Sequence, residues 1–436
     1  MIETFKIRNF RSILDAEIDF RYGEGAAPRH YQDREDWPFL QAGAGKHNRF
    51  VPVLAMYGAN ASGKTNLVNA VFQFQKLLLE GVGGRFFPNK LCSKYDYASF
   101  EAVVSTGGER RFRYTVAYDG EKMREERLAD LLPDGEKTLF SIGLGGKDFA
   151  GVAGGNYDES RMEDALRIEC TNDKGGWGKP FLPCLARTFP GLTDFAPLLV
   201  DELSDRLKVS KHNEFLISNA IDMLAQDDSD EARQAAMDKI AKLLAKFDFG
   251  VRGMKMERQR IDKNGDWLFE VFREPFRSSA IARNRGDAWI VDEVKVFHED
   301  ASGNIKALDF KTEESEGTKV VAALLGVCLW ALETGRTLFV DELDRSLHPF
   351  ILVSLIKLFK SKRYNRKNAR LIFTAHDPTP LDGDLLRVSE VGIVDKKPAS
   401  GTSFRRLCEY KGTRNVLNFR KQYLSGVYSG VPFPYI

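Results

Sequence analysis

Gly58-Ala59-Asn60-Ala61-Ser62-Gly63-Lys64-Thr65, GANASGKT in one-letter code, fulfils the pattern GxxxxGK[ST] of loops that bind phosphate groups. The apolar run from 51 to 56 before it is typical of a buried strand. After it, apolar residues recur at helical spacing up to Glu80, and Gly81 is placed to end that helix. Strand, glycine-rich loop and helix predict an α/β fold built around a nucleotide site.

The residue types of this loop have chemical reasons. Glycines let the backbone wrap tightly, so that its N–H groups face the phosphates. We expect Lys64 to reach the β and γ phosphates, and the Thr65 hydroxyl to ligate Mg²⁺. The predicted cofactors are therefore ATP and Mg²⁺.

Two later apolar strands end in polar residues. Residues 338–340 lead into Asp341 and Glu342, and residues 370–374 lead into His376. Alone, such residues usually begin solvated loops. In a sheet that carries a phosphate loop, we expect Asp341 to hold Mg²⁺, Glu342 to polarise the attacking water, and His376 to bind the γ phosphate.

Ser315-Glu316-Gly317-Thr318 precedes an apolar helix. Taken alone, it is a capped helix start. The serine hydroxyl and the helix N-terminus could together bind an anion.

Composition and charge exclude several classes. The formal net charge is +2, from 64 basic and 62 acidic residues, so no global excess indicates nucleic-acid or membrane binding. The cysteines and histidines show no zinc-ligand spacing. We find no signal core and no stretch of about 20 apolar residues, so we expect a cytoplasmic protein with no membrane contact.

Alternation over 14–20 predicts a half-buried strand, and alternation over 100–104 and 112–118 predicts an antiparallel hairpin. We expect irregular structure from Gly143 to Gly178, helices near 198–203, 217–224 and 236–244, and strands at 267–272 and 291–297.

Four motifs in this order resemble the ABC-type ATPases, with 315–318 similar to their signature motif. The segments 60–66, 315–319, 341–349 and 374–377 together resemble the bacterial AAA_15/AAA_21 proteins, soluble relatives of the RecF, SMC and OLD ATPases. Residues 7–12 resemble the family opening that brings an arginine toward the nucleotide, and 423–433 resemble the family tail.

The resemblance implies an α/β P-loop NTPase fold, an ABC-type ATPase head with an N-terminal antiparallel β subdomain and a helical insertion. The expected parts are an N-terminal lobe (1–142) with Walker A, an irregular and helical insertion (143–249), and a C-terminal lobe (250–436) with the signature, Walker B and switch histidine.

The resemblance also implies a homodimer, because the signature of one subunit binds the γ phosphate held by the other, and Asp344 falls at the D-loop that couples the two sites. The predicted cofactor-binding residues are Asn9, Arg11, Gly58, Asn60, Ala61, Ser62, Gly63, Lys64, Thr65, Asn66, Ser315, Gly317 and Asp344, with Thr65 and Asp341 as metal ligands and Glu342 and His376 as catalytic residues.

Some features of the sequence differ from those of the ATPase families that it resembles. Glu314 stands where transporters have leucine, no glutamine can be assigned to a Q-loop, and no long coiled coil is present. The residues after His376 leave no room for a Toprim nuclease domain, so we expect no nuclease activity in this chain.

We therefore predict an ATP-hydrolysing switch, the sensor or regulator of a bacterial antiphage system beside a separately encoded effector. One alternative is a RecF-like DNA-maintenance ATPase, because the basic run from Lys360 to Arg370 could touch DNA or RNA phosphates. Another is a scaffold that ATP clamps without turnover. A transporter subunit fits poorly, because transporter heads lack this large insertion.

Overall fold

The computed structural model describes residues 1–22, 40–41, 49–83, 86–91, 95–106, 110–143, 146–148, 159–172, 176–189, 193–211, 217–227, 229–262, 281–285, 288–413 and 418–431. They form two compact units, each discontinuous in sequence. The first holds 1–210, 335–344 and 356–436, and the second holds 211–334 and 345–355. The three contiguous parts predicted from the sequence remain a prediction.

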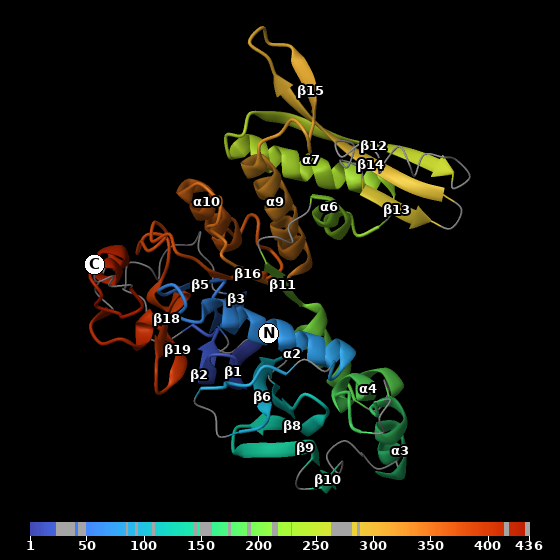
Figure 1. Cartoon of the computed structure of the whole chain (residues 1–436), viewed down its shortest axis with the longest axis vertical. Helices are drawn as coiled ribbons and strands as arrows, with labels where there is room; N and C mark the ends of the chain where they lie inside the picture. Colours follow the sequence, from blue (N-terminus) through green and yellow to red (C-terminus); the bar gives the residue numbers. More distant parts are fainter. Residues whose placement is uncertain are drawn as a thin grey trace. The chain divides into compact units, whose positions relative to one another are not determined.

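A large mixed sheet organises the first unit (Figure 1). Its order is β10-β9-β8-β7-β6-β1-β2-β19-β18-β5-β17-β16-β11. The strands β18, β5, β17 and β16 run parallel, whereas β1, β2 and β6 to β10 form the antiparallel part. Their bounds are β1 Ile2–Phe10, β2 Ile13–Asp19, β5 Val53–Tyr57, β6 Ala98–Ser105, β7 Arg111–Tyr118, β8 Met123–Leu132, β9 Gly135–Gly143, β10 Gly146–Asp148, β11 Leu207–Lys211, β16 Thr337–Asp341, β17 Arg370–Thr374, β18 Val391–Lys397 and β19 Gly401–Arg406. The predicted antiparallel subdomain and α/β fold class are confirmed.

Helix α2 (Lys64–Glu80) packs on this sheet. Its Phe74 ring lies 5.2 Å from Phe5 and 5.9 Å from Phe100, centroid to centroid. These rings belong to the alternating buried faces of β1 and β6, so burial of apolar area holds the helix in place. The helix ends where predicted, because Gly81 has a φ of 82° and its amide bonds to the Leu77 carbonyl.

Short helices follow the antiparallel strands: α3 (Glu159–Glu169), α4 (Phe181–Thr188), α5 (Ala196–Val200) and the π-helical turn η1 (Asp201–Asp205). The prediction of irregular structure from Gly143 to Gly178 is therefore wrong for α3. Met162, Ala165 and Leu166 of α3 are buried, a helical spacing that the glycine-rich surroundings hid. The predicted stripe near 198–203 is only partly right, since Leu198 is 56% exposed.

The described part of the second unit contains a four-stranded sheet and the helices that pack near it (Figure 1). The helices are α6 (Ile217–Ala225), α7 (Asp230–Lys246) and α9 (Glu316–Thr334), and the strands are β12 Val251–Asp262, β13 Ile281–Arg285, β14 Ala288–Glu299 and β15 Ile305–Asp309. A Cβ atom on Gly326 of α9 would come within 2.8 Å of the Ala220 Cβ on α6, so glycine permits this close crossing. The strand predicted at 291–297 lies within β14, whereas 267–272 lies outside the described residues.

Contrary to the sequence expectation, α9 is long and apolar enough to cross a membrane by length and composition. However, 67% of its apolar window is buried inside the fold, which is typical of a core helix. The remaining elements are β3 Leu40–Gln41, β4 Arg49–Phe50, α10 Pro349–Lys360, η3 Val388–Glu390, η4 Leu407–Glu409 and α11 Phe419–Leu424.

Candidate nucleotide-binding site

Three parallel strands bring the phosphate loop and the carboxylates to one edge of the sheet. β17 lies between β5 and β16, with Thr374 opposite Met56 and Phe373 opposite Val340. The loop 58–63 follows β5, and Asp341 ends β16. Ligands bind at this carboxyl edge in open α/β sheets.

Lys64 lies folded into the phosphate loop. Its Nζ donates to the carbonyl oxygens of Gly58 at 2.6 Å and Ala59 at 3.1 Å. Burial lowers the pKa of Lys64, and the negative charges of Asp341, Asp344 and Glu342 oppose that shift. The loop lysine and the three predicted carboxylates therefore share one electrostatic environment.

Two loop glycines allow close approach of the neighbouring strands. A Cβ on Gly58 would lie 2.2 Å from the Val394 carbonyl oxygen, and one on Gly63 would lie 2.1 Å from Thr402 Oγ1. Gly63 also has a φ of 105°, which side chains rarely tolerate. Ala61, at a φ of 60°, continues the left-handed path of the loop, and Asn60 beside it is exposed.

A hydrogen-bond chain fixes the loop from behind. Asn66 Nδ2 donates to Ser12 Oγ, and the Ser12 and Thr402 hydroxyl oxygens lie 2.7 Å apart. Thr402 Oγ1 in turn donates to the Ser62 carbonyl at 2.9 Å. No local pattern in the sequence marks Thr402, because the sheet brings β19 beside the loop.

Thr374 organises the carboxylate pair. Its hydroxyl donates to Asp341 Oδ1 at 2.7 Å and accepts from the Glu342 amide at 2.7 Å. Glu342 has a φ of 53°, a left-handed turn that directs it away from the strand that ends at Asp341. Asp341 is buried and Glu342 is half-buried. The sequence predicted Thr374 as the end of a strand and the first residue of the 374–377 motif, without this role.

Asp344 holds the switch segment. Its Oδ2 accepts from the amides of His376 and Asp377, each at 2.7 Å. The His376 side chain is exposed. The predicted D-loop and switch residues are therefore joined, through the backbone of the histidine and not through its ring.

Asn9 and Arg11, which were predicted to bind the nucleotide, make contacts within the fold. Asn9 is 1% exposed; its Nδ2 donates to the Tyr95 and Tyr97 carbonyls, and its Oδ1 accepts from the Asn89 amide. The Arg11 guanidinium lies over the Phe87 ring, 4.7 Å from its centroid. Asn9 thus uses its amide inside the fold, and Arg11 is stacked on an aromatic ring.

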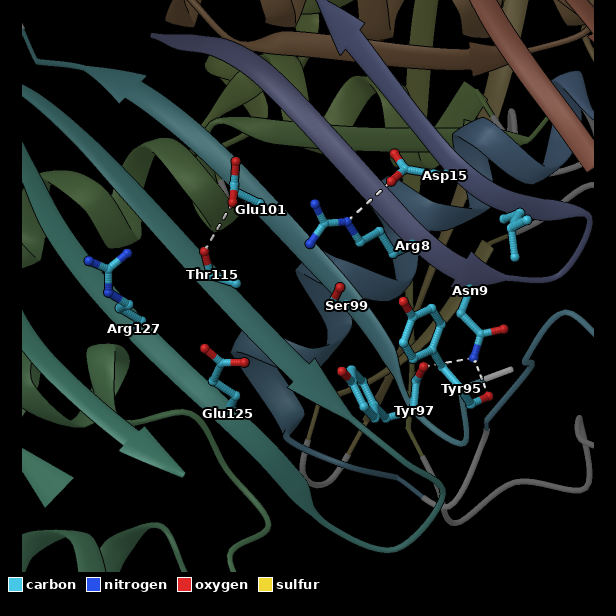
Figure 2. Close-up of a pocket in the computed structure, with 11 residues that line it drawn as sticks. Arg8, Asn9, Asp15, Tyr95, Tyr97, Ser99, Glu101, Thr115, Glu125 and Arg127 are labelled. Carbon is cyan, nitrogen blue, oxygen red and sulfur yellow. Dashed lines mark hydrogen bonds and ion pairs between the residues drawn. The ribbon is translucent and has the colours of Figure 1, made fainter. Parts of the chain in front are cut away.

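Asn9 also borders a cavity of about 690 Å³ on the antiparallel strands (Figure 2). Tyr95 and Tyr97 line one end, with ring centroids 5.8 Å apart. Arg8, which precedes Asn9 on β1, is paired with Asp15 of β2 at 3.3 Å. None of the residues predicted for the phosphate site lines this cavity except Asn9.

The signature residues lie in the second unit, at the N-terminus of α9. Ser315 Oγ accepts from the Thr318 amide at 3.1 Å, as a helix cap does. Ser315 is exposed, and a Cβ on Gly317 would meet nothing closer than Ser315 Oγ at 3.8 Å. The signature surface is therefore open within the unit.

The first unit fits Mg²⁺-ATP. Among the described residues, the buried Ser62 Oγ and Asp344 Oδ1 lack hydrogen-bond partners, which is costly unless a ligand satisfies them. Thr65 is exposed at the start of α2, beside the lysine. In the described parts, no group of three or more His, Cys, Asp or Glu side chains could hold a metal ion.

A phosphate loop after a central parallel strand, carboxylates at the same sheet edge and an antiparallel β part define an ABC-type ATPase head. Residues 196–382 match the AAA_21 family model, described as "AAA domain, putative AbiEii toxin, Type IV TA system". This match covers less than half of the chain and supports an AAA/ABC-type ATPase. A comparison with curated proteins found no match.

Solved structures offer remote likenesses. The SMC head domain from Thermotoga maritima shares 13% identity with a TM-score of 0.39, over 93% of this chain and 98% of that chain. The Smc head of Pyrococcus furiosus bound to the C-terminal domain of ScpA shares 12% with a TM-score of 0.38, over 93% and 96%. The recombination mediator RecF shares 13% with a TM-score of 0.35, over 93% and 98%.

Proposed function

We propose that the protein is an ATP-dependent switch that hydrolyses Mg²⁺-ATP. The observation that carries this proposal is that the phosphate loop with Lys64 and the carboxylate pair Asp341 and Glu342, which Thr374 holds, lie at one edge of the sheet. Such a cluster can bind a metal-phosphate group, and Glu342 is the carboxylate that would polarise the attacking water.

Each residue has a distinct task in this proposal. Lys64 leaves the Gly58 and Ala59 carbonyls to bind the β and γ phosphates, and the Thr65 hydroxyl and the Asp341 carboxylate hold Mg²⁺. When bound, Mg²⁺ neutralises phosphate charge. Glu342 accepts a proton from the attacking water, and the His376 ring donates to the γ phosphate.

We further propose that the active unit is a homodimer. The exposed Ser315 and the half-buried Gly317 would bind the γ phosphate held by a second copy, and Asp344 would couple the two sites. Light scattering of the Glu342→Gln variant tests this: Mg²⁺-ATP should double the mass, whereas Mg²⁺-ADP should not. A monomer under both conditions would refute the dimer.

For the biological role we propose a cytoplasmic sensor or regulator of antiphage defence that acts on a separately encoded effector. The family description of the matched residues supports this direction. The test is to express the chain with its neighbouring genes and challenge the cells with phage. Protection should require both the neighbour and Lys64, and protection by a Lys64→Ala chain would count against the role.

A second candidate is a RecF-like DNA-binding ATPase. Lys362, Arg363, Arg366 and Lys367 are exposed in one loop of the first unit and could contact phosphates. The exposed part of the predicted basic run is shorter than expected, because Lys360 and Arg370 at its two ends are buried. Replacing the four exposed residues with glutamine should abolish salt-dependent duplex binding if this candidate is right.

The third reading, an ATP clamp without turnover, is separated from the first by phosphate release. A clamp would show no turnover in the wild type, and Glu342→Gln would change nothing.

A further inference from the structure

Ser315 is held on both sides within the second unit. The Thr318 amide donates to Ser315 Oγ at 3.1 Å, and the two hydroxyl oxygens lie 2.8 Å apart. The Ser315 amide donates in turn to Glu314 Oε2 at 3.3 Å. The serine is therefore oriented through its hydroxyl and through its backbone.

The Glu314 carboxylate is itself held from another element. Its Oε1 forms a hydrogen bond with Nε2 of His298, near the end of β14. The Glu314 side chain is 7% exposed, against 25% for His298. One carboxylate oxygen thus binds a strand and the other binds the residue that begins α9, so the two bonds fix the direction of the carboxylate.

This direction matters for an anion site. The N-terminus of α9 and the Ser315 hydroxyl attract a phosphate group. A carboxylate one residue earlier repels the same group by like charge if it turns outward. The hydrogen bond to His298 keeps the Glu314 carboxylate turned toward β14. In this orientation its other oxygen accepts the Ser315 amide.

We infer that His298 and Glu314 are positioning residues for phosphate binding by Ser315. The inference rests on the proposed function, in which Ser315 binds the γ phosphate held by a second copy. His298 acts through Glu314, and Glu314 acts through the Ser315 backbone. Neither residue touches the nucleotide.

The test uses the full chain with the Glu342→Gln substitution as parent, in Mg²⁺-ATP. Sedimentation measures the dimer dissociation constant. We expect His298→Leu to raise this dissociation constant about tenfold or more, because the substitution removes about one charge-assisted hydrogen bond. His298→Gln should stay within about threefold of the parent, because the glutamine amide can donate to the same oxygen.

Two controls separate positioning from general damage. Binding of a fluorescent ATP analogue should be unchanged in both His298 variants, since Lys64 belongs to the other unit. Glu299→Gln removes an exposed neighbour that pairs with Arg252 at 2.6 Å, and it should leave the dimer as it is. Thermal unfolding confirms that each variant is folded.

The outcomes are distinct. The inference is overturned if His298→Leu dimerises like the parent, or if His298→Gln fails as badly as His298→Leu, since shape and not the hydrogen bond would then be required. If His298→Leu does not fold, Glu314→Gln decides, because it keeps the shape but has one acceptor for two donors. It should weaken the dimer at least about threefold, and no effect would refute the inference. If the parent itself stays monomeric in ATP, the proposed dimer fails, and the inference fails with it.

Discussion

Thr374 donates its hydroxyl hydrogen to Asp341 Oδ1 at 2.7 Å and receives the Glu342 amide hydrogen on the same oxygen. One buried hydroxyl therefore fixes the proposed metal ligand and the start of the turn that carries the proposed base. Thr374 is 0% exposed, so water cannot replace the bond if it is lost.

Thr374→Val keeps the shape and removes this bond. We expect the free energy of unfolding to fall by about 1–3 kcal/mol, and ATP turnover to fall about 10- to 100-fold as the carboxylates lose their alignment. Thr374→Ser should restore turnover. Urea unfolding and phosphate release measure the two effects, and full turnover in the valine variant would contradict the proposed alignment.

Lys64→Ala should weaken ATP binding about 100-fold or more, since the lysine is expected to make charge-assisted bonds to two phosphates. Titration calorimetry measures the affinity. Lys76→Ala is the matched control, because Lys76 lies on the same helix and pairs with Glu80 at the surface. An unchanged affinity in Lys64→Ala would remove the basis for the phosphate site.

Glu342→Gln should lower turnover about 100-fold or more while ATP affinity remains within a few-fold, because general-base catalysis contributes about that factor. Single-turnover phosphate release checks the rate. Glu333→Gln, which breaks a surface pair with Lys239, serves as the control. Equal turnover in wild type and Glu342→Gln would show that another group activates the water.

Lys360→Met should cost about 3–5 kcal/mol of stability. Lys360 and Glu390 are 1% and 0% exposed and form an ion pair, and Arg387 pairs with the same carboxylate at 3.3 Å, so removing Lys360 takes away one of its two buried cations. The exposed Lys362→Met should change stability by less than about 0.5 kcal/mol. Denaturant unfolding compares the two, and similar stabilities would mean that Arg387 alone compensates the charge of Glu390.

We expect the buried Glu126 to make the stability of the protein depend on pH. Burial raises its pKa to about 7 from the usual 4.5, although the Phe181 and Leu182 amides and the Tyr114 hydroxyl oppose the shift. The folded chain therefore binds more protons than the unfolded chain between these values, so this group makes stability fall as pH rises from about 4.5 to about 7.

Glu126→Gln removes this contribution. Between pH 5 and pH 7.5, the wild type should lose up to a few kcal/mol more than the variant. Urea unfolding at both pH values tests this, and parallel pH profiles would show that Glu126 does not titrate in that range.

Several parts of the fold were predictable from local patterns of residues. GANASGKT between an apolar run and a helical stripe specified β5, the loop and α2, because strand burial, glycine conformations and helix periodicity are properties of neighbouring residues. Strands that end at Asp341 and Thr374 were predictable for the same reason.

How these parts meet depends on contacts between residues that are distant in sequence. Thr402 lies hundreds of residues from Ser62 in sequence, and Thr374 bridges the next strand in the sheet, so neither role leaves a local pattern. Lys360 and Arg370 belonged to a predicted basic surface but are buried, because their charges are compensated across the fold by Glu390 and Glu202. Side-chain type and spacing set what a segment can do, whereas burial and long-range pairing set which of those chemistries the fold uses.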